Sequence, residues 1–91
     1  EIFRSFLGLK SLNLSLNHMR HLPKIKQFSF LNLISLDLSY NDLTSQAMES
    51  LEELNHLEHL SFEGNKIKRV PKEKSYPVFM SLKSLNLRGN R

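Results

Sequence analysis

The sequence predicts an α/β solenoid fragment, with short parallel strands on a concave face and extended, 3-10 or short helical segments on a convex face. Two observations support this fold class. A phrase of spaced leucines, closed by an asparagine, occurs four times, and the closing asparagines are separated by 24, 24 and 25 residues. These residues are Asn17, Asn41, Asn65 and Asn90. Self-similarity at a period of roughly 20 to 50 residues is typical of architectures that stack one unit on the next.

The strands are predicted from the alternation of leucine with polar residues inside each phrase, as at Leu36 and Leu38. Successive side chains of a strand point to opposite faces, so the leucines face a core and the residues between them face solvent. A strand of three or four residues cannot bury its leucines alone. Each coil must therefore pack against the next, and stability becomes a sum over neighbouring coils.

The four closing asparagines are expected to be structural. After each strand the chain turns inward, which leaves backbone N–H and C=O groups facing the core, and such groups need partners. A side-chain amide can donate to one kind and accept from the other. We therefore expect Asn17, Asn41, Asn65 and Asn90 to form a ladder bonded to the backbone of the turns.

The convex segments are expected to differ between coils. Pro23 and Pro71 indicate extended chain, because proline fixes φ and removes a backbone donor. The middle coil instead predicts a short helix with Ser45 as its N-cap. The apolar stripe of this helix consists of Ala47, Met48, Leu51 and Leu54. A second apolar column, three residues ahead of each phrase, is predicted from Phe6, Phe30, Leu54 and Phe79.

The repeat length, the leucine and proline at Leu22 and Pro23, and the phenylalanines ahead of the strands resemble the typical 24-residue class of leucine-rich repeat. The resemblance covers the whole chain and implies a horseshoe-shaped fold, found in many intracellular adaptors and extracellular receptors. Residues 1–91 are expected to form about three and a half coils of a longer protein. Both ends of the fragment are expected to be uncapped, because no polar cap covers their leucines.

Composition limits the classes of protein. The chain contains no run of about 18 apolar residues, so no membrane span is predicted. It contains no cysteine and no visible signal peptide, which favours an intracellular, cytoplasmic location, with cytoskeletal, ciliary (axonemal) or nuclear sites left open. The glycosylation triplet Asn13-Leu14-Ser15 argues for an extracellular location, which we rank lower.

The side chains between the leucines are predicted to cover the concave face. The candidate protein-binding residues are Ser11, Asn13, Leu16, Ser35, Asp37, Tyr40, His59, Ser61, Glu63, Asn86 and Arg88. Leu16 and Tyr40 directly precede their asparagines, where Gly64 and Gly89 stand in the later coils. Tyrosine is a frequent interface anchor, so this pair is the candidate contact point. The alternative is that Tyr40 packs on its own turn.

Charge is segregated along the chain. Residues 1–32 carry a net charge of +4, residues 33–65 carry −7 without any Lys or Arg, and residues 66–91 carry +7. The densest basic stretch is a candidate contact for an acidic partner surface or a phosphate backbone. Its basic residues are Lys66, Lys68, Arg69, Lys72 and Lys74. A solvated edge is the alternative, because basic runs carry little specificity.

No catalytic, metal or cofactor site is predicted. The histidine pairs His18 with His21 and His56 with His59 fall on different walls of the predicted coils, and no third ligand has the spacing for zinc. The chain has only three glycines and no glycine-rich phosphate loop. Its serines repeat with the coil instead of meeting a histidine and an aspartate. We therefore expect a protein that is not an enzyme.

The sequence favours a non-catalytic protein–protein interaction scaffold or adaptor within a larger intracellular assembly, such as a cytoskeletal or ciliary one. The partner is a protein of unknown identity, and the oligomeric state is open. One alternative is the ligand-binding ectodomain fragment of an extracellular receptor, which cysteine caps or a glycan at Asn13 would favour. A nucleic-acid-linked adaptor is the weaker alternative, and a steep salt dependence of binding would favour it.

Overall fold

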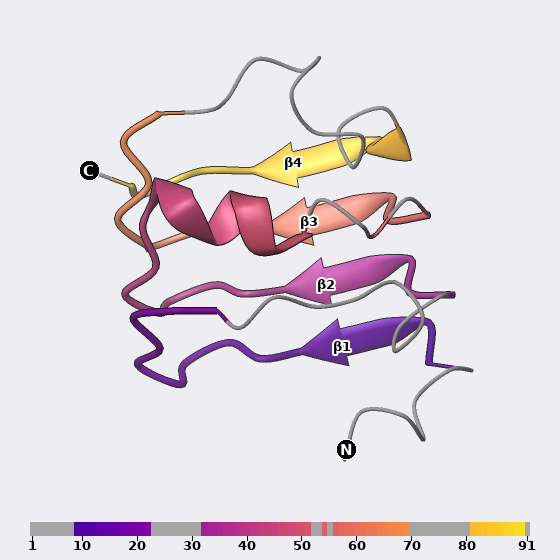
Figure 1. Cartoon of the computed structure of the whole chain (residues 1–91), viewed down its shortest axis with the longest axis horizontal. Helices are drawn as coiled ribbons and strands as arrows, with labels where there is room; N and C mark the ends of the chain where they lie inside the picture. The colour runs from indigo at the N-terminus through magenta and orange to yellow at the C-terminus, as the bar shows by residue number, and fades with distance from the viewer. Residues whose placement is uncertain (1–8, 23–31, 52–53, 55, 70–80, 91) are drawn as a thin grey trace.

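The computed structural model describes residues 9–22, 32–51, 54, 56–69 and 81–90. The described elements, in chain order, are β1 (Ser11–Asn13), β2 (Ser35–Asp37), the 3-10 helix η2 (Ser45–Leu51), β3 (His59–Ser61) and β4 (Ser84–Asn86). The strands form one four-stranded sheet in the order β1-β2-β3-β4, and every neighbouring pair is parallel. Figure 1 shows the four arrows side by side and pointing the same way, with η2 on one side of the sheet.

The register of the sheet places equivalent positions of the coils beside one another. Leu12 pairs with Leu36, Leu36 with Leu60, and Leu60 with Leu85. Backbone bonds continue past the strand ends, as where the Leu38 N–H donates to the Ser61 carbonyl at 2.8 Å. Parallel strands need a crossover between them, and the remainder of each repeat supplies that connection.

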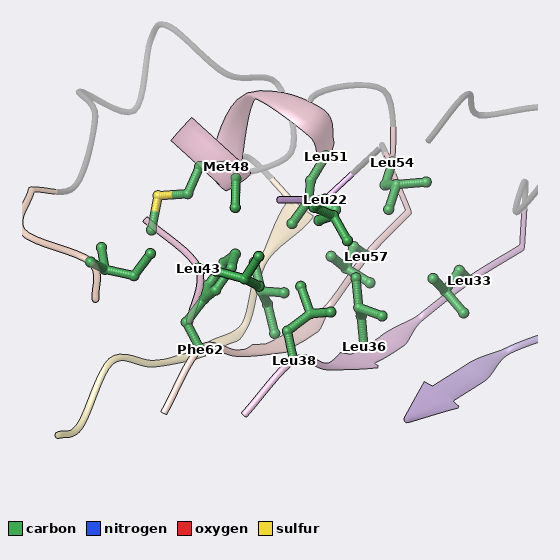
Figure 2. Close-up of a cluster of buried hydrophobic side chains, with 13 residues drawn as sticks. Leu22, Leu33, Leu36, Leu38, Leu43, Met48, Leu51, Leu54, Leu57 and Phe62 are labelled. Atoms are coloured by element: carbon green, nitrogen blue, oxygen red, sulfur yellow. The ribbon is translucent and has the colours of Figure 1, made fainter. Parts of the chain in front are cut away.

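The core lies between the sheet and η2, as Figure 2 shows for Met48 and Leu51 above the leucines of the strands. Leu36 and Leu60, the leucines of β2 and β3, are buried because the alternation places them on the face that η2 covers. The predicted stripe is confirmed on the helix for Ala47, Met48 and Leu51, which are buried. Its fourth member, Leu54, is also buried but lies beyond the end of η2 at Leu51. The leucines of β1 and β4 are half-buried and pack against this central cluster.

The helix of the middle coil is a 3-10 helix, and the prediction that Ser45 is its N-cap was wrong. The Ala47 N–H donates to the Thr44 carbonyl at 2.9 Å, so the first helical turn closes on Thr44. The Ser45 Oγ instead accepts from the backbone N–H groups of Lys68 and Arg69, at 3.1 and 3.2 Å. The chain that follows the turn of the next coil brings both donors to this hydroxyl, which satisfies them.

Some sequence expectations fall outside the described residues. They concern Phe6, Phe30, Phe79, Pro23 and Pro71. Leu54, which belongs to the same predicted column as the three phenylalanines, is described and is buried. Within the described ranges, no helix has the length and apolar character needed to cross a membrane.

Candidate functional site

The ladder asparagines occupy the turns that follow the strands. The Asn41 Oδ1 accepts from the backbone N–H groups of Asn17 and Met19, both at 3.0 Å. Its Nδ2 donates to the carbonyls of Leu14 and Leu38, again at 3.0 Å. One side chain therefore bonds its own turn to the turn of the preceding coil.

The same pattern continues along the sheet. The Asn65 Oδ1 accepts from the Leu43 N–H at 3.0 Å, and the Asn90 Oδ1 accepts from the Ile67 N–H at 2.7 Å. Asn41 and Asn65 are buried. Among the described residues, no buried side-chain nitrogen or oxygen lacks a hydrogen-bond partner. The side-chain amides of Asn41 and Asn65 are thus hydrogen-bonded to backbone groups, and they have no free polar atom with which to bind a ligand.

The residue before each ladder asparagine has a left-handed backbone. We call these four residues the left-handed positions: Leu16 (φ 61°), Tyr40 (φ 56°), Gly64 (φ 69°) and Gly89 (φ 68°). Glycine adopts this conformation without steric penalty, whereas a residue with a side chain is strained by roughly 1–2 kcal/mol. Leu16 and Tyr40 are recognisable in the sequence as candidates, but their backbone strain was not predicted. Gly64 and Gly89, which occupy the equivalent positions of the later coils, were the indication in the sequence that these positions have a left-handed backbone.

Leu16 and Tyr40 are also strongly exposed for large hydrophobic residues, with 71% and 51% of their surface accessible. The Tyr40 ring lies against Gly64 of the next coil, because a Cβ added to Gly64 would stand 2.5 Å from the Tyr40 Cδ1 atom. The ring thus packs on the following turn, and not on its own turn as the alternative prediction had it. The missing side chain of Gly64 makes room for it.

Hydrogen bonds fix the outer end of the Tyr40 side chain. Its hydroxyl donates to the Glu63 Oε2 at 3.0 Å, while the Glu63 Oε1 accepts from the Asn86 Nδ2 at 3.1 Å. The hydrogen bond to Glu63 and the negative charge of that carboxylate raise the pKa of Tyr40, and Asp37 adds to the effect. The raised pKa extends to higher pH the range in which the Tyr40 hydroxyl is protonated and can donate to Glu63.

The polar candidates lie on the face of the sheet opposite the core, which we call the open face. Aligned across the strands in one row are Ser11, Ser35, His59 and Ser84, and in the next row Asn13, Asp37, Ser61 and Asn86. The Asp37 Oδ1 accepts from the Ser39 N–H at 2.9 Å, and the Ser39 and Ser61 hydroxyls lie 2.7 Å apart. The open face is therefore polar, and parts of it are held by bonds between coils.

The basic candidates lie beyond the last strand residue of the third coil. Lys66, Lys68 and Arg69 are exposed, and the Lys66 Nζ lies 3.7 Å from the Asp42 Oδ1. Lys72 and Lys74 lie outside the described residues. The sheet thus brings the Leu16 and Tyr40 candidates together with the open face, whereas the basic residues follow the turn and form a separate surface.

The two histidines of the third coil occupy different parts of it. His59 lies on β3, and His56 precedes that strand in the chain. In the part of the chain that the structure describes, no group of three or more His, Asp or Glu side chains is placed to hold a metal ion. The described surface therefore has three candidate binding features: the exposed apolar pair Leu16 and Tyr40, the polar open face, and the basic residues Lys66, Lys68 and Arg69.

Comparisons with known proteins agree with this architecture. Residues 7–67 match the family described as leucine rich repeat. The chain is 38% identical to Protein PAC2 of Saccharomyces cerevisiae over 87 residues, which cover 93% of this chain and 15% of that protein. It is 40% identical to trophoblast glycoprotein of Macaca fascicularis over 65 residues, which cover 71% of this chain and 16% of that protein.

A third relative is X-ray radiation resistance-associated protein 1 of Mus musculus, with 37% identity over 71 residues, 78% of this chain and 9% of that protein. The chain thus spans 16% or less of the length of each of these relatives. Because the family match extends over most of the chain and the coils repeat one backbone plan, this chain belongs to the leucine-rich repeat family.

Proposed function

We propose that this chain is part of a curved, non-catalytic scaffold that binds a partner protein through Leu16, Tyr40 and the adjoining open face. Leucine-rich repeats mediate protein–protein interactions, which supports the general role. One observation supports the choice of surface. Leu16 and Tyr40 are exposed hydrophobic residues at positions where the backbone is left-handed and where two other coils have glycine.

The energetics of these two residues support a binding role. Each is strained by roughly 1–2 kcal/mol relative to glycine, and in the free protein little apolar burial offsets that strain. Backbone strain of this kind concentrates at functional sites. Burial of a large apolar side chain against a partner would contribute about 1.5–3 kcal/mol, which is enough to offset the strain in the complex.

The surroundings of Tyr40 also suit an interface. Its ring is held by Gly64 on one side and by the hydrogen bond to Glu63 at its tip, so little side-chain freedom remains to be lost on binding. Polar residues of the open face lie beside it. Interfaces commonly combine a small apolar centre with a polar rim, and aromatic residues are frequent energetic anchors.

The proposed setting is a larger intracellular assembly. The proposal of an intracellular site rests on the composition, since repeat proteins of oxidising compartments commonly use disulfides and this chain has no cysteine. The proposal that the chain is one part of a longer scaffold is supported by the small share of each relative that it covers.

The test is the binding kinetics of the full-length protein with a partner identified by photo-cross-linking from position 15, next to Leu16. We expect Tyr40→Ala to weaken binding by about 1–2 kcal/mol, mainly through faster dissociation. Glu49→Ala, an exposed substitution on η2, is the matched control and should keep the wild-type rates. Wild-type dissociation of both Tyr40→Ala and Leu16→Gly would place the interface elsewhere.

A second candidate is a ligand-binding segment of an extracellular protein. It is favoured by the exposure of Asn13, which begins the glycosylation triplet Asn13-Leu14-Ser15, and by a relative whose name is trophoblast glycoprotein. Mass spectrometry of the protein purified from its native source discriminates the two. A glycan on Asn13 would support the extracellular candidate, and unmodified Asn13 in a cytoplasmic fraction would contradict it.

A further inference from the structure

Along residues 66–68 the side chains alternate between solvent and core, as in extended chain, and Arg69, which follows, is exposed as well. Ile67 is buried, whereas its neighbours Lys66 and Lys68 are exposed. Lys66 forms a parallel bridge with Thr44 of the preceding coil. Because successive side chains of extended chain point to opposite sides, Lys66 and Lys68 project to the same side. We call residues 66–69 the cationic strip.

The backbone of the cationic strip is held from both sides. The Ser45 Oγ of the preceding coil accepts from the N–H groups of Lys68 and Arg69, at 3.1 and 3.2 Å. The Asn90 Oδ1 of the following coil accepts from the Ile67 N–H at 2.7 Å. The cations therefore stand on a fixed backbone, which reduces the ordering entropy that a bound partner would have to overcome.

Two shallow hollows adjoin the strip, and Lys66 and Lys68 line both of them. The first, of about 450 Å³, is bordered by Gly64, against which the Tyr40 ring lies, and by Gly89, whose lack of a side chain leaves its backbone open to a close approach. The second, of about 380 Å³, is bordered by Arg69. The two hollows thus adjoin all three cations of the strip.

The charges of the strip are largely uncompensated. The Lys66 Nζ lies 3.7 Å from Asp42 in an exposed ion pair. For Lys68 and Arg69, no carboxylate among the described residues lies within ion-pair distance. Two neighbouring cations on a fixed backbone thus face solvent next to a hollow that a chain could enter.

We propose that the cationic strip binds an extended acidic segment of a partner protein, with carboxylates at alternate positions. Lys66 and Lys68 are two residues apart in extended chain, a separation of roughly 6–7 Å. Carboxylates at alternate positions of an extended peptide repeat at the same distance and can face both cations at once. The strip uses other side chains than the Leu16 and Tyr40 contact, although its first hollow reaches Gly64, on which the Tyr40 ring packs.

A protein segment fits the strip better than a nucleic acid. Residues 33–65, which precede the strip, carry a net charge of −7 and no Lys or Arg. A long polyanion bound at the strip would also approach residues 33–65 and be repelled by their negative charge. A short acidic segment can contact the strip without approaching the other acidic residues.

The test is a direct binding measurement on the full-length protein with labelled peptides. One peptide has three glutamates alternating with serines, and the second has the same composition with its three glutamates adjacent. We expect the alternating peptide to bind several-fold more tightly, with an affinity that falls as salt is raised. Equal binding of the two peptides, no binding, or tighter binding of a short DNA duplex would overturn the proposal.

Substitutions locate the bound peptide. Lys68→Gln and Arg69→Gln should each weaken the alternating peptide about two- to fivefold, the range expected for an exposed ion pair. Lys83→Gln is the matched control, because this lysine is exposed, pairs with Glu58 at 3.4 Å and changes the net charge equally. An equal loss in Lys83→Gln would mean unspecific charge attraction and contradict the proposal.

Ser45 provides a test that leaves the net charge unchanged. As a positioning residue it holds the backbone of Lys68 and Arg69, so Ser45→Ala should reduce the preference for the alternating peptide toward equality. Ser45→Thr retains a hydroxyl and should restore the preference. A merely structural role would lower the unfolding midpoint without changing the ratio of the two peptide affinities, and that result would count against the fixed strip.

Discussion

Two neighbouring positions of each coil behave differently in this chain. The ladder position is asparagine in all four coils, and where it is buried its amide is bonded to backbone of two turns. The left-handed position directly before it has one backbone conformation but two kinds of residue, Leu16 and Tyr40 in the first coils and Gly64 and Gly89 in the later ones. The fold thus requires the asparagine side chain at the ladder position. At the left-handed position it requires only the backbone conformation, so the side chain there is available for binding.

The largest expected effect tests the ladder position. Asn41→Ala should lower the free energy of unfolding by about 1–3 kcal/mol, because it leaves buried backbone groups of two turns without partners. Asn17→Ala should have a smaller effect, since Asn17 is exposed and water can replace its bonds to Leu14 and Ser15. Equilibrium unfolding of the full-length protein measures both. Equal losses would break the distinction between buried and exposed ladder residues.

The next effect concerns the space that Gly64 leaves for Tyr40. Gly64→Ala should lower the free energy of unfolding by roughly 1–2 kcal/mol through backbone strain, and displacement of the Tyr40 ring should add to that loss. Gly89→Ala is the matched control: its φ is nearly the same, but its Cβ would meet only Gly64 backbone atoms at 3.5 and 3.6 Å. Identical losses in the two variants would mean that the Tyr40 contact contributes nothing.

A smaller effect of opposite sign is expected at Leu16. Leu16→Gly relieves roughly 1–2 kcal/mol of strain, while the greater freedom of glycine in the unfolded chain removes about 0.5–1 kcal/mol of that gain. The variant should therefore be more stable than wild type by about 0.5 kcal/mol in chemical denaturation, although we expect it to bind its partner less well. A destabilised Leu16→Gly variant would show that the Leu16 side chain supports the fold.

The smallest effect is electrostatic. Glu63→Gln should lower the pKa of Tyr40 toward its ordinary value of about 10, because the carboxylate that raises it is removed. A raised pKa in the folded state stabilises the protein below the ordinary pKa, and this contribution is lost as pH rises through the raised value. The difference between ultraviolet titrations of the protein with Tyr40 and with Tyr40→Phe isolates the tyrosinate of Tyr40 and measures the shift. An unchanged titration curve would contradict the Glu63 bond.

Most of the fold could be predicted from the sequence, because the 24-residue spacing and the leucine alternation act within each coil. The strand register follows from the same spacing. The bond from Ser45 to Lys68 and Arg69 could not be predicted, since these partners are 23 and 24 residues away and the serine also fits a local capping pattern. A single sequence does not show which distant donors the stacking of coils brings to a hydroxyl.

The candidate surface was only partly predictable. The sequence selected Leu16 and Tyr40 by their place beside the ladder, but their strain depends on φ, which the glycines at 64 and 89 only suggest. The contact between Tyr40 and Gly64 also depends on which way the ring turns. Periodicity aligns two turns without specifying whether a side chain lies over its own turn or over the next one.

The direction of the asparagine bonds has a consequence for how the coils open. The Leu43 N–H donates to the Asn65 Oδ1, and the Ile67 N–H donates to the Asn90 Oδ1. Each of these amides is therefore protected from exchange by the coil that follows it. If the coil containing Asn90 detaches, Ile67 becomes free to exchange its proton with solvent while Leu43 remains protected. Amide exchange at one turn therefore reports whether the next coil along the chain is folded. If the C-terminal coil frays, the faster exchange appears at an amide of the preceding repeat.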